Sequence, residues 1–108
     1  MSIEDQVILK DEIQNFEKKL AYFNISFNDL VEEVPTHKKT REQAILIGEK
    51  TSEEKNFVEH LYLTKRLPVT KMCQKFLVTR KVIYGSKNFI ISVIVICVEK
   101  FSLIKKWI

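Results

Sequence analysis

Residues that break regular structure are scarce in this chain, and their scarcity limits the folds open to it. Its 108 residues include two glycines, Gly48 and Gly85, and two prolines, Pro35 and Pro68. Strand-and-turn architectures need a breaker at most of their turns, whereas helices need one only near their ends. A chain of this length with 45% apolar residues can bury one core. We therefore expect residues 1–108 to form a single domain: an all-α, compact multi-helix fold of about six to seven helices.

Residues 1–66 are predicted to supply the N-terminal helices of this domain. Apolar residues recur every three or four positions from Ile3 to Phe23, which indicates a long amphipathic first helix. Ser26 is a good N-cap for a short second helix, which Pro35 should end. Thr40 opens a Thr-x-x-Gln sequence, the pattern of a capping box, so a third helix is expected to begin there.

Residues 68–89 are predicted to form two helices joined by a tight corner. Pro68 suits the first position of a helix, Leu77 lies at the corner, and Thr79 can cap the second helix. This is the layout of a helix-turn-helix, whose second helix presents its N-terminal residues to DNA base edges. Since no turn signal follows Thr79, the second helix should run on through residues 90–97.

The apolar run from Phe89 to Val98 should be the buried centre of the domain. Its ten residues are half of the roughly 20 that a membrane-spanning helix needs. β-branched side chains dominate it, so a strand is the competing interpretation. A last helix is predicted over residues 101–108, where large apolar side chains again recur at helical spacing. With no membrane span and no signal pattern, we expect a cytoplasmic protein that does not insert into a membrane.

Charge is distributed unevenly along the chain. Residues 1–36 carry three Lys/Arg and eight Asp/Glu, a balance of −5; residues 37–66 carry seven and five, a balance of +2. Residues 67–108, which should hold the helix-turn-helix and the C-terminal core helices, carry eight and one, a balance of +7. A basic C-terminal part points to a polyanion such as nucleic acid, although a solvated lysine-rich face gives the same count.

The side chains of the second helix fit the chemistry of DNA recognition. Arginine can read guanine through two hydrogen bonds and asparagine can read adenine, while threonine and lysine suit phosphates. An ordinary helical hairpin is the competing interpretation, and Gly85 should weaken the second helix by roughly 1 kcal/mol relative to alanine. The residues expected to contact base edges are Arg80, Lys81, Tyr84 and Asn88, and those expected to contact phosphates are Lys71, Thr79 and Lys87.

Sequence patterns for catalysis and metal binding are missing. The chain lacks the phosphate-binding GxxxxGK[ST] and GxGxxG motifs and the catalytic HExxH and GxSxG motifs. Cys73 and Cys97 lie far apart, and with His37 and His60 they do not reproduce the ligand spacing of a zinc site. We therefore expect no enzyme, no cofactor, no metal and no small-molecule substrate.

Three blocks of sequence are more specific than these patterns. They are Phe27-x-x-Leu30 followed by Pro35-x-His37 and Thr40-Arg41, then Arg66-Leu67-Pro68, then Thr79-Arg80-Lys81. In these blocks, and collinearly over nearly its whole length, the chain resembles the C-terminal domain of the bacterial RNA polymerase sigma-I factors, the SigI family. Members of that family usually have a glycine-containing corner where this chain has Leu77.

The resemblance implies a specific role and specific partners. It implies a helical domain that recognises the promoter −35 element through its helix-turn-helix and so directs transcription initiation. The whole factor would contact core RNA polymerase through another domain, and a membrane-spanning anti-sigma factor of the RsgI type would hold it inactive. The alternative is a protein-docking module whose main role is to bind the anti-sigma factor or RNA polymerase.

Overall fold

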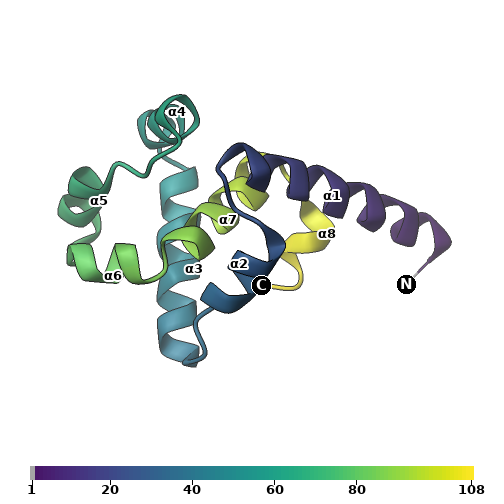
Figure 1. Ribbon diagram of the computed structural model, residues 1–108, viewed down its shortest axis with the longest axis horizontal. Coiled ribbons are helices and arrows are strands. Elements are labelled where there is room, and N and C mark those ends of the chain that lie inside the picture. The colour runs from purple at the N-terminus through teal and green to yellow at the C-terminus, as the bar shows by residue number, and fades with distance from the viewer. Residues whose placement is uncertain (1) are drawn as a thin grey trace.

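Helix α7 (Lys87–Val98) lies at the centre of the molecule, and the other helices pack around it (Figure 1). The computed structural model describes residues 2–108. Every residue of α7 from Phe89 to Ile96 is buried. Burial on all sides lets packing override the modest helix propensity of β-branched residues. The helical interpretation of this run and its place at the core are therefore confirmed.

The part of the chain from residue 2 onward contains helices and no strands, which confirms the all-α prediction. It has eight helices instead of six or seven, because the expected second helix of the corner is divided in two. No helix in this described part combines the length and the apolar character needed to cross a membrane. The other seven are α1 (Ile3–Tyr22), α2 (Phe27–Glu33), α3 (Lys38–Ser52), α4 (Lys55–Thr64), α5 (Val69–Phe76), α6 (Arg80–Gly85) and α8 (Ser102–Lys105).

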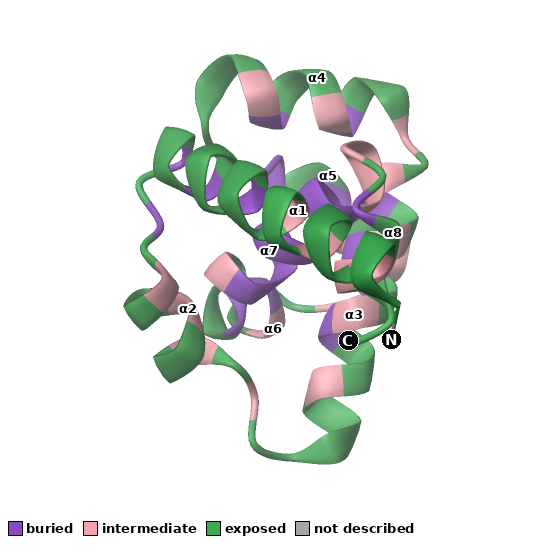
Figure 2. Ribbon diagram, turned by 90° about the vertical axis from the view of Figure 1, so that its right-hand side faces the viewer, coloured by how far each residue is buried: buried purple, intermediate pink, exposed green. Residues whose placement is uncertain are grey.

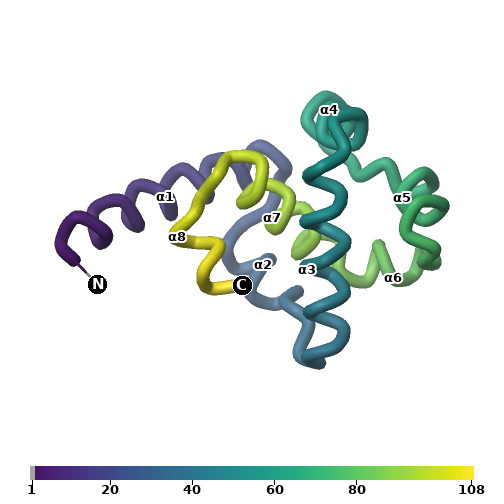
Figure 3. The backbone as a smooth tube through the Cα atoms, turned by 180° about the vertical axis from the view of Figure 1, so that it is seen from behind, coloured from purple at the N-terminus to yellow at the C-terminus, as the bar shows by residue number. Residues whose placement is uncertain are grey.

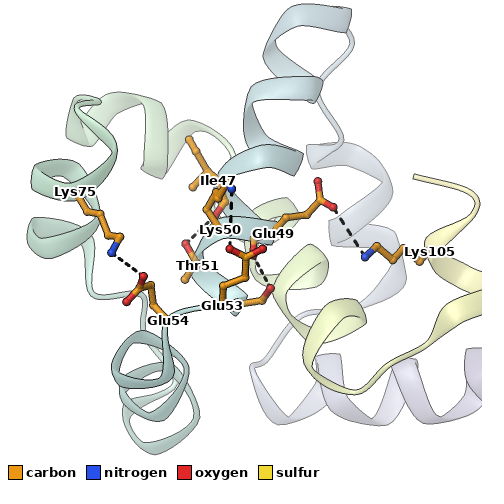
Figure 4. A network of polar contacts seen from close by, with 9 residues as sticks. Ile47, Glu49, Lys50, Thr51, Glu53, Glu54, Lys75 and Lys105 are labelled. Atoms are coloured by element: carbon orange, nitrogen blue, oxygen red, sulfur yellow. Dashed lines mark hydrogen bonds and ion pairs between the residues drawn. The ribbon is translucent and has the colours of Figure 1, made fainter.

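Helix α3 makes the main contact with α7 and crosses it at a glycine (Figure 3). A Cβ atom built on Gly48 would lie 2.7 Å from the Cβ of Val93 and 3.3 Å from the carbonyl oxygen of Ile90. Gly48 is therefore required for the close approach of two helices, and its φ is not positive. One turn later Thr51 is fully buried, and its hydroxyl donates to the carbonyl of Ile47 at 2.7 Å (Figure 4).

Helix α1 is packed over its C-terminal half and projects from the molecule over its N-terminal half (Figure 1), where most of its residues are exposed (Figure 2). Phe16 and Leu20 are buried, whereas the apolar side chains before them are largely exposed, with Ile3 at 80% and Ile13 at 42%. The periodicity from Ile3 to Phe23 correctly predicted the helix. The solvated half of its apolar stripe could not be inferred from periodicity, because that depends on which elements lie beside it.

The capping predictions have opposite outcomes at the next two helices. Ser26 caps α2 in a capping box with Asp29, as expected from the sequence. The predicted capping box at Thr40 is wrong, because the N-cap of α3 is His37, three residues earlier, and no side chain caps the helix there. The guanidinium of Arg41 instead donates to the carbonyl of Pro35 at 3.1 Å, which holds the turn before the helix.

The expected helix over residues 101–108 is reduced to the four residues of α8. Phe101 is buried, but Trp107 is 73% exposed and lies beyond the helix. A short helix without a packed apolar face gains too little to offset its nucleation cost. What fixes α8 is α1, because the Glu12 carboxylate accepts hydrogen bonds from the amides of Leu103 at 3.1 Å and Ile104 at 3.2 Å.

Candidate nucleic-acid interface

Helices α5 and α6 lie at the end of the molecule opposite to the N-terminus of α1, joined by a three-residue corner (Figure 1). Pro68 is the N-cap of α5, one position before the place that its ring suggested. Leu77 ends α5 in the left-handed region, with φ 56° and ψ 45°, and is 89% exposed. The Thr79 hydroxyl accepts a hydrogen bond from the amide of Val82 at 3.4 Å, so its predicted cap on α6 is confirmed.

The second helix of the corner does not continue into the core, and that prediction is wrong. Helix α6 ends at Gly85, and Ser86 leaves helical geometry with φ −131° and ψ 28° before α7 begins. Glycine costs backbone entropy in a helix, serine competes for backbone hydrogen bonds, and adjacent glycine and serine are a common cause of helix kinks. The predicted contact residues are consequently divided between two helices with different directions (Figure 1).

A first hollow, of about 340 Å³, brings together three of the predicted residues. Lys71 comes from the first turn of α5, while Arg80 and Tyr84 come from α6. All three side chains are exposed, and the Arg80 guanidinium donates a hydrogen bond to the hydroxyl of Thr70. His60 of α4 also lines this hollow, and nothing in the sequence pattern connected it to the corner.

A second hollow, also of about 340 Å³, lies on the other side of Tyr84. Lys87 and Asn88 line it from the first turn of α7. Lys65 and Arg66, from the link between α4 and α5, line it too and were not among the predicted site residues. Counting charge in blocks hid this pair, because the boundary between residues 66 and 67 assigned both to the weakly charged middle of the chain.

Two predicted residues, Lys81 and Asn88, differ from the others in their surroundings. Lys81 lines a hollow of about 220 Å³ on another side of α6, beside Thr40 and Gln43 of α3. Asn88 is half-buried, and its side-chain amide donates to the carboxylate of Glu33 at the end of α2. The seven predicted residues therefore extend over α5, the corner, α6 and the first turn of α7, and they do not all share one helical face.

The segment that contains these residues carries almost only positive charge. No Asp or Glu occurs between Glu59 and Glu99, a stretch that carries seven Lys/Arg. Among residues 2–108, one of these seven forms an ion pair: Lys75, whose ammonium lies 2.6 Å from the carboxylate of Glu54 (Figure 4). The other six have no carboxylate within ion-pair distance anywhere in the described chain: Lys65, Arg66, Lys71, Arg80, Lys81 and Lys87.

The arrangement offers cationic and hydrogen-bonding side chains. Cys73 and Cys97 are free thiols. Within residues 2–108 no three side chains of His, Cys, Asp or Glu come together as a possible metal site. A helix pair flanked by cations without carboxylate partners is suited to the backbone of a nucleic acid, where each neutralised phosphate releases bound counterions.

No family model matches the chain, but individual relatives among known proteins show its family. The chain is 32% identical over 99 residues to RNA polymerase sigma factor SigI of Bacillus anthracis, which covers 92% of this chain and 41% of that protein. It is 34% identical over 97 residues to SigI6 of Acetivibrio thermocellus, covering 90% and 38%, and 30% identical over 99 residues to SigI of Bacillus subtilis, covering 92% and 39%.

The chain thus spans about two fifths of the length of the curated relatives that it matches. The match extends across all of the residue blocks on which the resemblance rested. The chain belongs to the SigI family of RNA polymerase sigma factors, in which it corresponds to a C-terminal domain.

Proposed function

We propose that this chain is the promoter-binding domain of an alternative sigma factor. In this proposal α5 and α6 form a DNA-binding helix-turn-helix that recognises the −35 element and so directs transcription initiation. The observation that carries it is the set of cations without carboxylate partners on and beside these two helices. Membership of the SigI family supports the same role, because its members are sigma factors of RNA polymerase.

The side chains divide by their position around α6. Arg80 and Tyr84 are exposed on α6, so base contacts are assigned to them first, and Lys81 follows on the neighbouring side of the helix. Phosphate contacts are assigned to Lys71, Thr79 and Lys87. Asn88 reads adenine in this scheme only after its amide releases the Glu33 carboxylate.

The proposed partners follow from the SigI relationship. Promoter DNA is the ligand of this domain, and core RNA polymerase is contacted through the full-length factor. An RsgI-type anti-sigma factor holds the factor inactive in the cytoplasm. The domain performs no catalytic step, uses no cofactor and takes no small-molecule substrate.

Protein docking is the second candidate function, and a different surface favours it. Large apolar side chains are exposed on the N-terminal half of α1 and just after α8, including Ile3 at 80%, Val7 at 57% and Trp107 at 73%. Large exposed apolar patches often mark protein interfaces. Under this reading the main ligand is the anti-sigma factor or RNA polymerase, and DNA binding is secondary.

A binding selection from a randomised duplex library, followed by fluorescence anisotropy on the selected site, tests the first function. Arg80→Ala should weaken binding to the selected site by ~1–3 kcal/mol and relax the preference at one base pair. Lys106→Ala is the matched control, since it removes an exposed cation that lines neither of the two hollows. Selection of no consensus sequence, or unchanged binding by Arg80→Ala, would contradict the promoter-reading role of α6.

A further inference from the structure

The second hollow has the composition of an anion site. Three cations line it, Lys65, Arg66 and Lys87, together with the phenol of Tyr84 and the amide of Asn88. No carboxylate lines it. The carboxylate of Glu33 accepts a hydrogen bond from the side-chain amide of Asn88, one of the lining residues.

The floor of this hollow is formed by the core. Phe23, Leu67 and Ile91 are exposed by 6%, 6% and 3%, and they come from three separate parts of the chain. Side chains in a close-packed core hold their positions. The cations therefore surround a fixed concave surface, unlike the lysines of an exposed helix face.

The link between α4 and α5 holds two of the cations in place. The amide of Lys65 donates to the carbonyl of Leu61 at 2.7 Å, and its ammonium lies 4.5 Å from the centre of the Tyr22 ring. The amide of Arg66 donates to the hydroxyl of Thr64 at 3.2 Å. The backbone of this link is thus positioned before any ligand arrives, which lowers the entropy cost of binding.

The geometry points to this hollow as a phosphate anchor for the DNA backbone, outside the segment that α6 reads. This inference rests on the proposed function. The first hollow carries Arg80 and the second carries Lys65, Arg66 and Lys87, with Tyr84 lining both. A strand whose bases meet Arg80 can continue past Tyr84, so that a phosphodiester beyond the read bases enters the second hollow.

A phosphate anchor has a measurable signature in salt. Each phosphate contact contributes about 0.9 to the slope of log affinity against log salt concentration on duplex DNA. Arg66→Gln and Lys65→Gln should each weaken selected and scrambled duplexes by the same factor and reduce the slope by about 1. Arg80→Ala should instead reduce the difference between the two duplexes. Lys106→Gln, an exposed cation far from the hollow, should change neither quantity.

The contact itself is tested with a duplex in which single phosphates flanking the selected site are replaced, one at a time, by neutral methylphosphonates. At one flanking position the replacement should cost the parent domain affinity and cost Arg66→Gln nothing further. Arg66 is exposed, so the variant should fold; matching amide spectra of variant and parent establish this directly. The same cations could instead bind free inorganic phosphate, and titration of the domain with inorganic phosphate tests this alternative. The DNA anchor would be overturned if phosphate shifts the amide signals of residues 65–67 and 87 while Arg66→Gln keeps the salt slope of the parent.

Failure of the anchor and failure of the proposed function give different results. If Arg80→Ala loses specificity while Arg66→Gln and Lys65→Gln keep the parent's salt slope, the anchor is wrong and promoter reading by α6 stands. If the two link variants lose slope while Arg80→Ala binds like the parent, the anchor stands and the assignment of α6 is wrong. If the parent binds no duplex, both are overturned.

Discussion

The side-chain amide of Asn88 donates a hydrogen bond to the carboxylate of Glu33, a residue 55 positions earlier in the chain. The bond joins the first turn of α7 to the last residue of α2. Asn88 therefore has a structural partner in the free domain, on the same edge of the molecule as the cations.

Asn88→Ala should lower stability more clearly than it lowers DNA affinity. Removing the amide leaves the half-buried Glu33 carboxylate without its partner, at a cost of about 1 kcal/mol of unfolding free energy after allowance for solvent screening. The loss of DNA affinity should be smaller than that of Arg80→Ala, because the amide must break an existing bond to reach a base. Urea unfolding and anisotropy on the same variants measure the two quantities. A larger affinity loss than that of Arg80→Ala would show that Asn88 releases Glu33 in the complex.

Gly48→Ala should destabilise the fold by about 1–3 kcal/mol, the usual cost of overpacking a core. The added Cβ meets Val93 at 2.7 Å and the Ile90 carbonyl at 3.3 Å, so α3 and α7 would have to separate. Thermal unfolding followed by circular dichroism at 222 nm gives the change. An unchanged melting temperature would mean that the two helices can shift apart without loss.

Gly85→Ala is the same substitution in an open environment and should have the opposite sign. No atom lies within 4 Å of a Cβ built at Gly85, and its φ is not positive. Alanine lowers the entropy cost of helix formation, so the variant should be more stable by about 0.5–1 kcal/mol. It is thus the internal control for Gly48→Ala in the same assay. A loss of stability would indicate that the break between α6 and α7 needs glycine.

Glu12→Gln should loosen α8 with little effect on the rest of the fold. The charged carboxylate accepts from the amides of Leu103 and Ile104, and an anion there also favours the helix dipole. The loss should be about 1–2 kcal/mol. Trp107 is the single tryptophan and lies just after α8, so its fluorescence anisotropy reports the local change. Glu17→Gln, an exposed glutamate on the same helix, should leave the signal as it is.

Local signals in the sequence were enough for most of the helices. The period of α1, the N-cap of Ser26 and the cap of Thr79 each depend on residues within a few positions, and the structure confirms all three. The apolar run of α7 predicted the core for the same reason. The start of α3 was predicted wrongly because the turn before it is held by a contact that capping patterns do not include, the Arg41 guanidinium donating to the Pro35 carbonyl.

The sequence predicted only part of the candidate interface. Each of its helices is formed by residues close together in sequence, whereas its hollows are lined by residues far apart in sequence. Arg80 and Lys71 lie ten or fewer positions apart and were found together. The join between Lys65, Arg66 and Lys87 depends on how the α4–α5 link packs against α7, about 20 positions away in sequence. Helical periodicity relates residues within one helix and does not relate the α4–α5 link to the start of α7. The second hollow could therefore be found only from the three-dimensional structure.

Leu77→Gly should stabilise the corner. Leu77 has a φ of 56°, where a side chain with a Cβ is strained by roughly 1–2 kcal/mol, and at 89% exposed it loses little packing when truncated. The greater chain entropy of glycine in the unfolded state costs about 0.5–1 kcal/mol, so the free energy of unfolding should rise by a net ~0.5–1 kcal/mol. Leu63→Gly is the matched control: Leu63 is 85% exposed inside α4, so the same substitution there should cost about 1 kcal/mol. Urea denaturation of both variants gives the two signs, and a loss at both positions would show that Leu77 stabilises the corner through its side chain.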